Sequence, residues 1–480
     1  MRSSASQRGS VLVVAAIFAA IIAIALTSYL KLALGASKLA NRSFYMNAAQ
    51  NLADTGLERA LWSLNNEHAY PSPTHWTTGG FAARTGYSGE YQGTFPTSST
   101  FYSLSGGAQG QVKVWVGGFN ATSQTWHAVA QATVTLGDGT SLLKVAESYF
   151  QQRSWGDRGM ISRNGMSFNG NTRVDAWHSH ADTANPADDV LYSTGVAVPE
   201  AQIASPELVS LQNADIFGYA AIGTDDLTGI TVGATGRLAG NFAAGTGIDT
   251  SRVTYDFTAS FPDVPAPTNS GSTAGNNLVP INSNLGLPQV GDIQTGGVYY
   301  YYLGSISLNA SKTLTIGPSS DAKVVLVVSG NIGLAGSAQI IIQPGSSLTI
   351  YAAGDFDMGG SSGIQNGTSS QPSNPVNFTL LGTRTEAQIV GGLSMQIMNV
   401  RGVSYLSSVI FAPNANVRVL GTGDTYGSIV GNRVDMVGSG NFHQDLSLAN
   451  IRTSGIWKLL KWRELSVAAD RAAYGSQLAF

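Results

Sequence analysis

Residues 11–30 read VLVVAAIFAAIIAIALTSYL and contain neither a charge nor a proline. At 1.5 Å per residue, a helix of that length covers about 30 Å, the thickness of the hydrocarbon core of a bilayer. An uncharged run this long exceeds what the core of a soluble protein usually needs. A cleaved secretory signal is the alternative, but its apolar region is shorter and ends in a small-x-small cleavage site. The stretch therefore predicts a transmembrane helix.

The helical pattern continues beyond this stretch. Apolar residues recur at spacings of three and four as far as Leu61, and no proline occurs before Pro71. These spacings are typical of one face of a helix. We therefore expect a single helix over residues 10–65, with its first half in lipid and its second half in water.

The basic residues around the apolar stretch do not orient it. Arg2 and Arg8 precede the stretch, and three more follow it, namely Lys31, Lys38 and Arg42. The positive-inside comparison is thus balanced. Because the low-charge, turn-rich remainder of the chain is typical of an exported protein, we expect the N-terminus in the cytoplasm, the helix in the inner membrane and the bulk of the chain in the periplasm.

The composition favours short strands joined by tight turns. Of the 480 residues only 11% are charged, 57 are glycine and 43% are hydrophobic, and the formal net charge is −3. This is not the composition of a disordered chain, and it lacks the concentrated Lys and Arg that nucleic-acid binding requires. The chain has no cysteine, which excludes disulfides, thiol catalysis and Cys-ligated metal sites. No motif indicates a cofactor.

The N-terminal residues resemble a known family. QRGSVLVVAAIFAAIIAIAL, from Gln7 onward, and ADTGLERA at residues 53–60 are similar to type IV pilin-like proteins, and most of all to the PilX N-terminal family. In that class a prepilin peptidase cuts after the glycine that ends a short basic leader. The resemblance implies a leader at residues 1–9 and cleavage between Gly9 and Ser10. It also implies assembly with other pilin-like subunits through the helix, including Val11, Leu12, Val14, Leu57 and Glu58.

One position departs from the family pattern. Pilins usually carry a glutamate a few residues into the mature chain, where it is thought to meet the terminal amine of a neighbouring subunit. Val14 occupies that place here. The departure is compatible with a minor, tip or initiating component, which has no subunit ahead of it.

Residues 66–157 are expected to form a linker and a small antiparallel sheet. The first part is rich in proline, glycine and serine, which is typical of loops. Alternating strands are expected over residues 111–116, 127–136 and 141–150, and the turn Gly137-Asp138-Gly139 joins the last two.

From residue 158 to about 455, short modules of the form apolar-x-apolar recur, several of them followed by glycine. Examples begin at Met166, Ile230, Leu238, Ile306, Ile332, Phe356 and Val434. Spacings of roughly 10 and 20–25 residues suit the coils of a parallel β-solenoid, in which inward apolar residues stack on those of the next coil and glycine takes the corners. The expected fold class is mainly β, with a β-sandwich as the alternative to the solenoid.

Several segments of this region resemble an uncharacterised domain of bacterial PilX-like surface proteins. They are FPDVPAP at residues 261–267, VIFAPNA at 409–415, YGSIVG at 426–431, FHQDLSL at 442–448 and WREL at 462–465. The resemblance implies a solenoid with a spacer around residues 258–295, and it implies no chemistry. The tail, residues 456–480, is expected to form a last strand or cap that covers the open end of the solenoid. An interfacial amphipathic helix is the alternative for the tail.

Three groups of polar residues could carry chemistry. The first group is either a metal site or a polar loop and contains His178 and His180 with Asp182, Asp188 and Asp189. The second, His443 with Asp445, is either a His–carboxylate dyad or a set of structural hydrogen bonds. The third, Asp355 with Asp357, is either a glycosidase-like acid pair or two surface carboxylates. We favour the structural reading of each group and expect neither a metal site nor a catalytic residue, because no further ligand or base has a diagnostic spacing.

A run of four tyrosines is unusual. Tyr299, Tyr300, Tyr301 and Tyr302 would place two rings on each face of a strand. Tyrosine brings a large amphipathic contact area at little rotamer cost. The run is either a surface contact or a structural strand at an edge.

From these observations we infer the hypothesis that the protein is a non-catalytic minor component of a type IV pilus-like or type II secretion system. Its partners would be prepilin peptidase, membrane lipid, other pilin-like subunits and a surface polymer. The rival hypothesis is a membrane-anchored β-helix enzyme that acts on polysaccharide and uses Asp355 and Asp357 as its acids.

Overall fold

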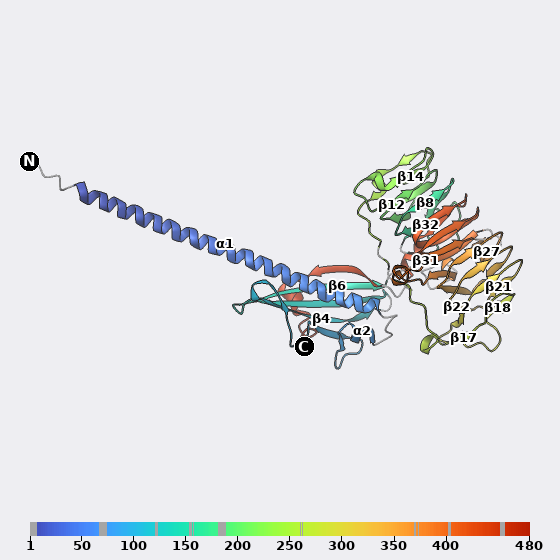
Figure 1. The fold of residues 1–480 in the computed structure, drawn as a ribbon, viewed down its shortest axis with the longest axis horizontal. Coiled ribbons are helices and arrows are strands. Elements are labelled where there is room, and N and C mark those ends of the chain that lie inside the picture. The colour runs from blue at the N-terminus through green and yellow to red at the C-terminus, as the bar shows by residue number, and fades with distance from the viewer. Residues whose placement is uncertain are drawn as a thin grey trace, which may run out of the picture. The chain divides into compact units, whose positions relative to one another are not determined.

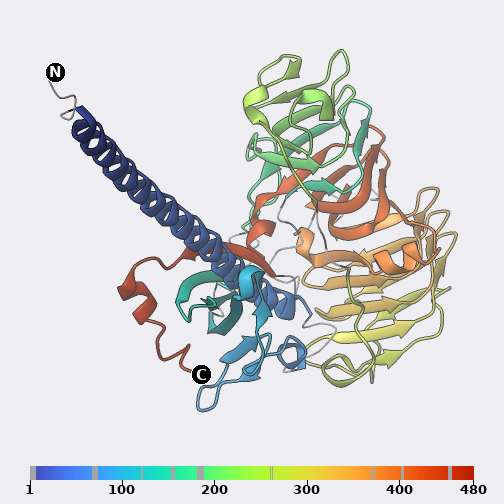
Figure 2. The same cartoon turned by 60° about the vertical axis from the view of Figure 1, so that its left-hand side comes forward.

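The computed structural model describes residues 7–66, 74–120, 123–152, 156, 158–180, 189–259, 261, 263–368, 371–372, 374–401, 405–451 and 457–480. The chain divides into two compact units: unit 1 contains Met1–Gln152 and Trp457–Phe480, and unit 2 contains Arg153–Ile456. The fold is mainly β, with one long N-terminal helix and an antiparallel sheet, which confirms this part of the expectation (Figures 1 and 2).

Unit 1 is built on α1, Gln7–Asn65, a single helix as the sequence predicts. Its apolar part is long enough to cross a membrane. Over residues 12–44 its side chains are exposed, apart from the half-buried Gly35. One face of the helix then becomes buried, at Ala49, Ala53, Leu57, Ala60 and Leu64.

The buried face of α1 packs on an antiparallel sheet with the strand order β1-β2-β4-β5-β6-β34, and β3 pairs with β4. The elements of this unit after α1 are α2 (Thr74–Thr78), β1 (Ala82–Ala83), β2 (Tyr91–Phe95), β3 (Tyr102–Ser103), β4 (Gln109–Asn120), β5 (Thr125–Thr135), β6 (Ser141–Gln152), β34 (Trp457–Glu464) and α4 (Ala468–Ala472). A Cβ atom at Gly56 would lie 2.7 Å from Val114 Cγ2. Glycine is therefore required where α1 comes closest to β4.

The C-terminal tail completes this sheet. β34 pairs antiparallel with β6, from Gln152 opposite Trp457 to Ala146 opposite Glu464. The buried Glu147 carboxylate on β6 accepts hydrogen bonds from Arg463 and, at 3.0 Å, from the Tyr474 hydroxyl. Residues 457–464 are thus an edge strand of unit 1. They form the expected strand and not the alternative amphipathic helix, but the strand belongs to unit 1, because its partner β6 lies in the distant N-terminal part of the chain.

Unit 2 consists of short strands that stack in three parallel ladders. Tyr299 pairs with Val324 and Val324 pairs with Leu348, so successive turns of the chain are 25 and 24 residues apart. Among the described strands of unit 2, only β27 (Gly363–Thr368) with β28 (Gln371–Pro372) forms an antiparallel pair. A β-sandwich is antiparallel, and the parallel pairs of unit 2 do not match that alternative.

The three ladders are listed here in spatial order. Ladder 1 contains β17 (Asn276–Asn277), β19 (Tyr299–Leu303), β22 (Lys323–Val328), β25 (Ser347–Ala352), β29 (Phe378–Gly382), β31 (Tyr405–Leu420), β32 (Asp424–Val437), β7 (Met160–Ser162), β10 (Ala201–Ser205), β12 (Asp215–Ile222) and β16 (Val253–Thr254). Ladder 2 contains β20 (Ile306–Leu308), β23 (Ile332–Leu334), β26 (Phe356–Met358), β30 (Gln396–Val400), the second halves of β31 and β32, β8 (Met166–Asn169), β11 (Val209–Ser210) and β13 (Ile230–Thr231). Ladder 3 has two separate parts. The first part contains β18 (Leu285–Leu287), β21 (Thr313–Ile316), β24 (Gln339–Ile342) and β27. The second part contains β33 (Phe442–Asp445), β9 (Arg173–Trp177), the start of β12, β14 (Arg237–Ala239) and β15 (Gly247–Ile248).

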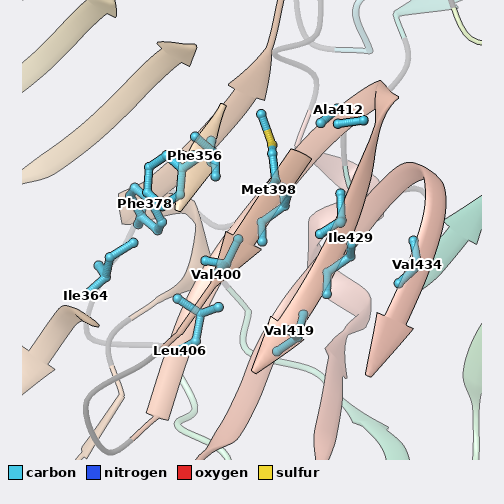
Figure 3. Close-up of a cluster of buried hydrophobic side chains, with 14 of the residues drawn as sticks. Phe356, Ile364, Phe378, Met398, Val400, Leu406, Ala412, Val419, Ile429 and Val434 are labelled. Atoms are coloured by element: carbon cyan, nitrogen blue, oxygen red, sulfur yellow. The ribbon is translucent and has the colours of Figure 1, made fainter. Parts of the chain in front are cut away.

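The recurring apolar-x-apolar modules line up in these ladders. Ile306 pairs with Ile332 and Ile332 with Phe356 in ladder 2, so the modules stack on one another. Their apolar side chains point into one continuous core (Figure 3). Gly360, at a corner, has a φ of +67° and lies against Gly336 of the preceding turn, where a Cβ atom would be 2.8 Å from the Gly336 carbonyl oxygen.

The order of the strands in ladder 1 differs from their order in the chain. Within unit 2, the chain begins in the middle of the stack at β7 and runs to one end of the stack at β16. It then passes to the other end at β17 and returns to the middle at β32, where Ile429 pairs with Met160. We call the junction of β32 and β33 with β7, β8 and β9 the seam. The first and last segments of unit 2 are therefore neighbours in space.

The segment that joins the two ends crosses the outside of the stack (Figure 1). We call residues 257–268 the strap; residues 260 and 262 lie outside the described residues. Phe261 and Val264 of the strap pack on outward apolar side chains of ladder 1, namely Ile161, Ala204, Ala221, Leu381, Phe411 and Val430. Asn414 Nδ2 donates to Asp263 Oδ1 at 2.6 Å. The spacer expected from FPDVPAP is thus docked along the stack, although Pro262 itself is not described.

Replacing Phe261 with alanine should loosen the strap and lower the free energy of unfolding of unit 2 by about 2–3 kcal/mol, the value of one buried phenylalanine. Its ring is 7% exposed and meets Phe411 edge-on at 5.8 Å. Urea unfolding followed by hydrogen exchange of peptides from ladder 1 measures the loss. Phe242→Ala, at a ring that is 40% exposed, is the control and should cost less. Equal costs would contradict the docking of the strap.

Candidate functional site

The first half of α1 is the most extensive exposed apolar surface among the described residues. Leu12 is 75% exposed and Val14 is 50% exposed, and the large apolar side chains that follow are similarly uncovered, including Ile17, Phe18, Ile21, Ile22, Ile24 and Leu26. No charge interrupts this surface before Lys31. Exposure of this much apolar surface indicates a lipid or protein partner.

The predicted processing residues lie at the start of the same helix. The backbone of Gly9, Ser10 and Val11 belongs to the first turns of α1. The remainder of the predicted leader, residues 1–6, lies outside the described residues. Cleavage at this position remains a prediction.

The two predicted assembly residues in the second half of α1 have different surroundings. Leu57 is buried against the sheet of unit 1, whereas Glu58 is exposed. Leu57 therefore positions the helix on its own sheet. Glu58, like Leu12 and Val14, is exposed.

The tyrosine run belongs to ladder 1. Tyr301 is fully buried and its hydroxyl donates to Asp292 Oδ2 at 2.5 Å. Burial and this hydrogen bond raise the pKa of Tyr301. The Tyr302 hydroxyl is 2.9 Å from the carbonyl oxygen of Thr268 at the end of the strap. These two rings are structural, so a surface contact is left to the half-buried Tyr299 and Tyr300.

The most strongly buried polar cluster lies at the seam. His443 Nδ1 is 2.6 Å from Asp175 Oδ1, and Nε2 is 3.6 Å from Asp424 Oδ2. Burial by itself would lower the pKa of His443, but the hydrogen bonds and negative charges of the two aspartates outweigh it, so the pKa is raised above the usual value. The expected partner, Asp445, does not contact the imidazole through its carboxylate. It accepts from Ser179 Oγ at 2.6 Å and from the Ser447 amide at 3.0 Å.

Sequence reasoning missed Asp175, Asp424 and the Tyr192 ring that stacks on His443 with a centroid distance of 3.7 Å. They come from separate segments, and no local spacing connects Asp175 with His443. Only the strand pairing of the seam, where His443 lies opposite Asp175, brings them together.

In the part of the chain that the structure describes, no group of three or more His, Cys, Asp or Glu side chains is arranged so that it could hold a metal ion. His178 and His180 are exposed, and their ring centroids are 6.3 Å apart. His180 has a φ of +58° and therefore lies in a turn rather than a strand. Asp182 and Asp188 fall outside the described residues.

The carboxylates of the rival enzyme hypothesis make contacts between neighbouring turns of the chain. Asp355 Oδ1 accepts from the Ile397 amide at 3.0 Å, and Asp357 Oδ1 accepts from Asn399 Nδ2 at 2.8 Å. Arg384 lies 3.6 Å from Asp355. These contacts tie β26 to the next coil, which is a structural role.

Comparison with known proteins identifies a domain but no established activity. Residues 268–451 match a family described as a domain of unknown function, DUF7305. This match lies within unit 2 and covers less than half of the chain. No curated protein matches the sequence.

A solved structure with similarity to the chain is the crystal structure of the competence-associated pilin ComZ from Thermus thermophilus. The two chains are 10% identical, the alignment covers 87% of this chain and 97% of that chain, and the TM-score is 0.27. A score this low does not establish a common fold.

Proposed function

We propose that the chain is a minor pilin-like subunit of a type IV pilus-like or type II secretion system. It inserts into the inner membrane through α1, assembles through the same helix and displays unit 2 as a non-catalytic β-solenoid. The observation that carries the proposal is the division of α1, whose first half is apolar and uncovered while its second half packs on an antiparallel sheet. A helix built in this way can leave lipid and enter a bundle of similar helices without refolding the sheet.

The proposal assigns a partner to each part of the helix. The leader up to Gly9 faces the cytoplasm and is the substrate of prepilin peptidase. Residues 11–30 contact lipid first and other pilin-like helices afterwards. Unit 2 lies in the periplasm and then on the pilus or cell surface, where it contacts a surface polymer.

Val14 supports a particular position in the filament under this proposal. An apolar side chain there cannot neutralise the terminal amine of another subunit. The subunit therefore belongs at the tip or in the initiating complex, where no preceding amine has to be met.

Peptidase cleavage is tested by replacing Gly9 with valine in the full chain, expressed in a bacterium that has a prepilin peptidase. Mass spectrometry should find Ser10 at the N-terminus of the wild-type protein and the uncut leader in the variant. The variant should be absent from sheared filaments. The expected change is from nearly complete to no cleavage, because the β-branched side chain occupies the cut position.

Gly35→Val is the matched control, since a Cβ atom at Gly35 meets no atom within 4 Å. It should be processed as the wild type is. Wild-type protein that keeps Met1, or that is released as a soluble body lacking residues 1–30, would contradict the proposal.

A further inference from the structure

The imidazole of His443 lies between two carboxylates at the seam. The side chain is 2% exposed and Asp175 is fully buried. Nδ1 bonds Asp175 on β9, whereas Nε2 faces Asp424 at the start of β32 from 3.6 Å. Nε2 has no hydrogen-bond partner in the described part of the chain. The consecutive strands β32 and β33 thus meet the distant strand β9 at one ring.

The protonation state of the ring decides whether both contacts are favourable. A neutral imidazole has one N–H and one lone pair. If Nδ1 carries the proton, the lone pair of Nε2 faces Asp424; if Nε2 carries it, the lone pair of Nδ1 faces Asp175 at 2.6 Å. Only the imidazolium ion presents an N–H to each carboxylate.

The groups around the ring favour a cation further. Tyr192 stacks on it at 3.7 Å and the Tyr426 ring lies 4.9 Å away, and aromatic faces attract cations. The charged and titratable groups that face the ring from the packed elements are Arg173 and Asp175 on β9, Asp424 and Tyr426 on β32, and Tyr192. Arg173 Nε and the Tyr192 hydroxyl both bond Asp175 Oδ2, at 2.7 and 2.9 Å, and leave Oδ1 to His443.

We propose that His443 is a pH-sensitive clasp that fastens the last strand of unit 2 to the first segment across the seam. When protonated, it ties β33 to both β9 and β32 and holds the Tyr192 ring. When it loses its proton, one carboxylate is left against a lone pair and the ring loses its charge. The clasp is therefore closed at low pH and loosens as the pH rises.

The direction in which stability changes with pH follows from the linkage between proton binding and folding. The folded unit binds the proton more tightly than the unfolded chain does, because the pKa of His443 is raised. The stabilisation is then complete below the unfolded pKa of about 6.5 and is lost as the pH rises through the folded pKa.

The test uses the full chain in detergent at pH values between 5 and 9. The urea midpoint of the seam is read by pulsed hydrogen exchange of peptides that cover β9 and β33. We expect the wild-type midpoint to fall as the pH rises, and the midpoint of His443→Gln to be lower and nearly independent of pH. His178→Gln, at an exposed histidine close in sequence to the seam, should follow the wild type.

A second variant keeps the test decisive if His443→Gln does not fold. Asp424→Asn leaves the bond to Asp175 and removes one carboxylate, so the fall should occur at a lower pH than in the wild type. A difference between wild type and His443→Gln that is constant or increases with pH would overturn the proposal. So would an Asp424→Asn profile identical to that of the wild type.

Discussion

Replacing Phe378 with alanine is expected to lower the free energy of unfolding of unit 2 by about 3–5 kcal/mol, the range for a fully buried phenylalanine. The side chain is 0% exposed and lies beside Phe356 and Ile364 in the core (Figure 3). It stacks on Leu348 of the preceding turn. The loss is large because the surrounding strands are fixed by their ladders and cannot close the cavity. Urea unfolding with hydrogen exchange of β25 and β29 peptides measures it.

Thr379→Ala is the matched control for this prediction. Thr379 is the next residue on the same strand, is half-buried and pairs with Thr349 on the outward side. Its replacement should cost less than about 1 kcal/mol, as most substitutions outside a core do. Similar losses at both positions would show that the inward and outward faces of β29 are wrongly assigned.

Excising residues 153–456 is expected to leave a folded unit 1. Gln152 and Trp457 are directly opposite each other in the antiparallel pair of β6 and β34. A two-residue Asn-Gly turn can close such a pair. The shortened chain should keep its sheet, insert into membranes and, if the proposed function holds, be cut after Gly9 and enter filaments. Circular dichroism, limited proteolysis and fractionation measure these properties.

A chain that ends at Gln152 is the control for the excision. It lacks β34, whose Trp457 belongs to the core cluster that includes Phe150, and it also lacks the Arg463 partner of the buried Glu147. We expect it to be degraded. Degradation of the excised chain as well would mean that unit 1 depends on unit 2 for folding.

Local pattern predicted the parts of the fold that form locally. The uncharged run and the spacing of apolar residues predicted α1, and alternation predicted strands that correspond to β4, β5 and β6. The apolar-x-apolar modules predicted short strands with stacked apolar residues, which the ladders contain. Each of these signals lies within the element that it describes.

Partners that are distant in the sequence could not be predicted in this way. Nothing in residues 457–464 indicates β6 as their neighbour, so local pattern does not place this strand in unit 1. The order of coils in the stack, which begins and ends at the seam, is likewise absent from any local pattern. His443 was recognised as notable, but its carboxylate partner was sought two residues away at Asp445 instead of at Asp175.

The entry and exit of unit 2 through Gln152 and Trp457 have a mechanical consequence. A force applied to unit 2 reaches unit 1 through the neighbouring strands β6 and β34 at once, so the two strands share the load.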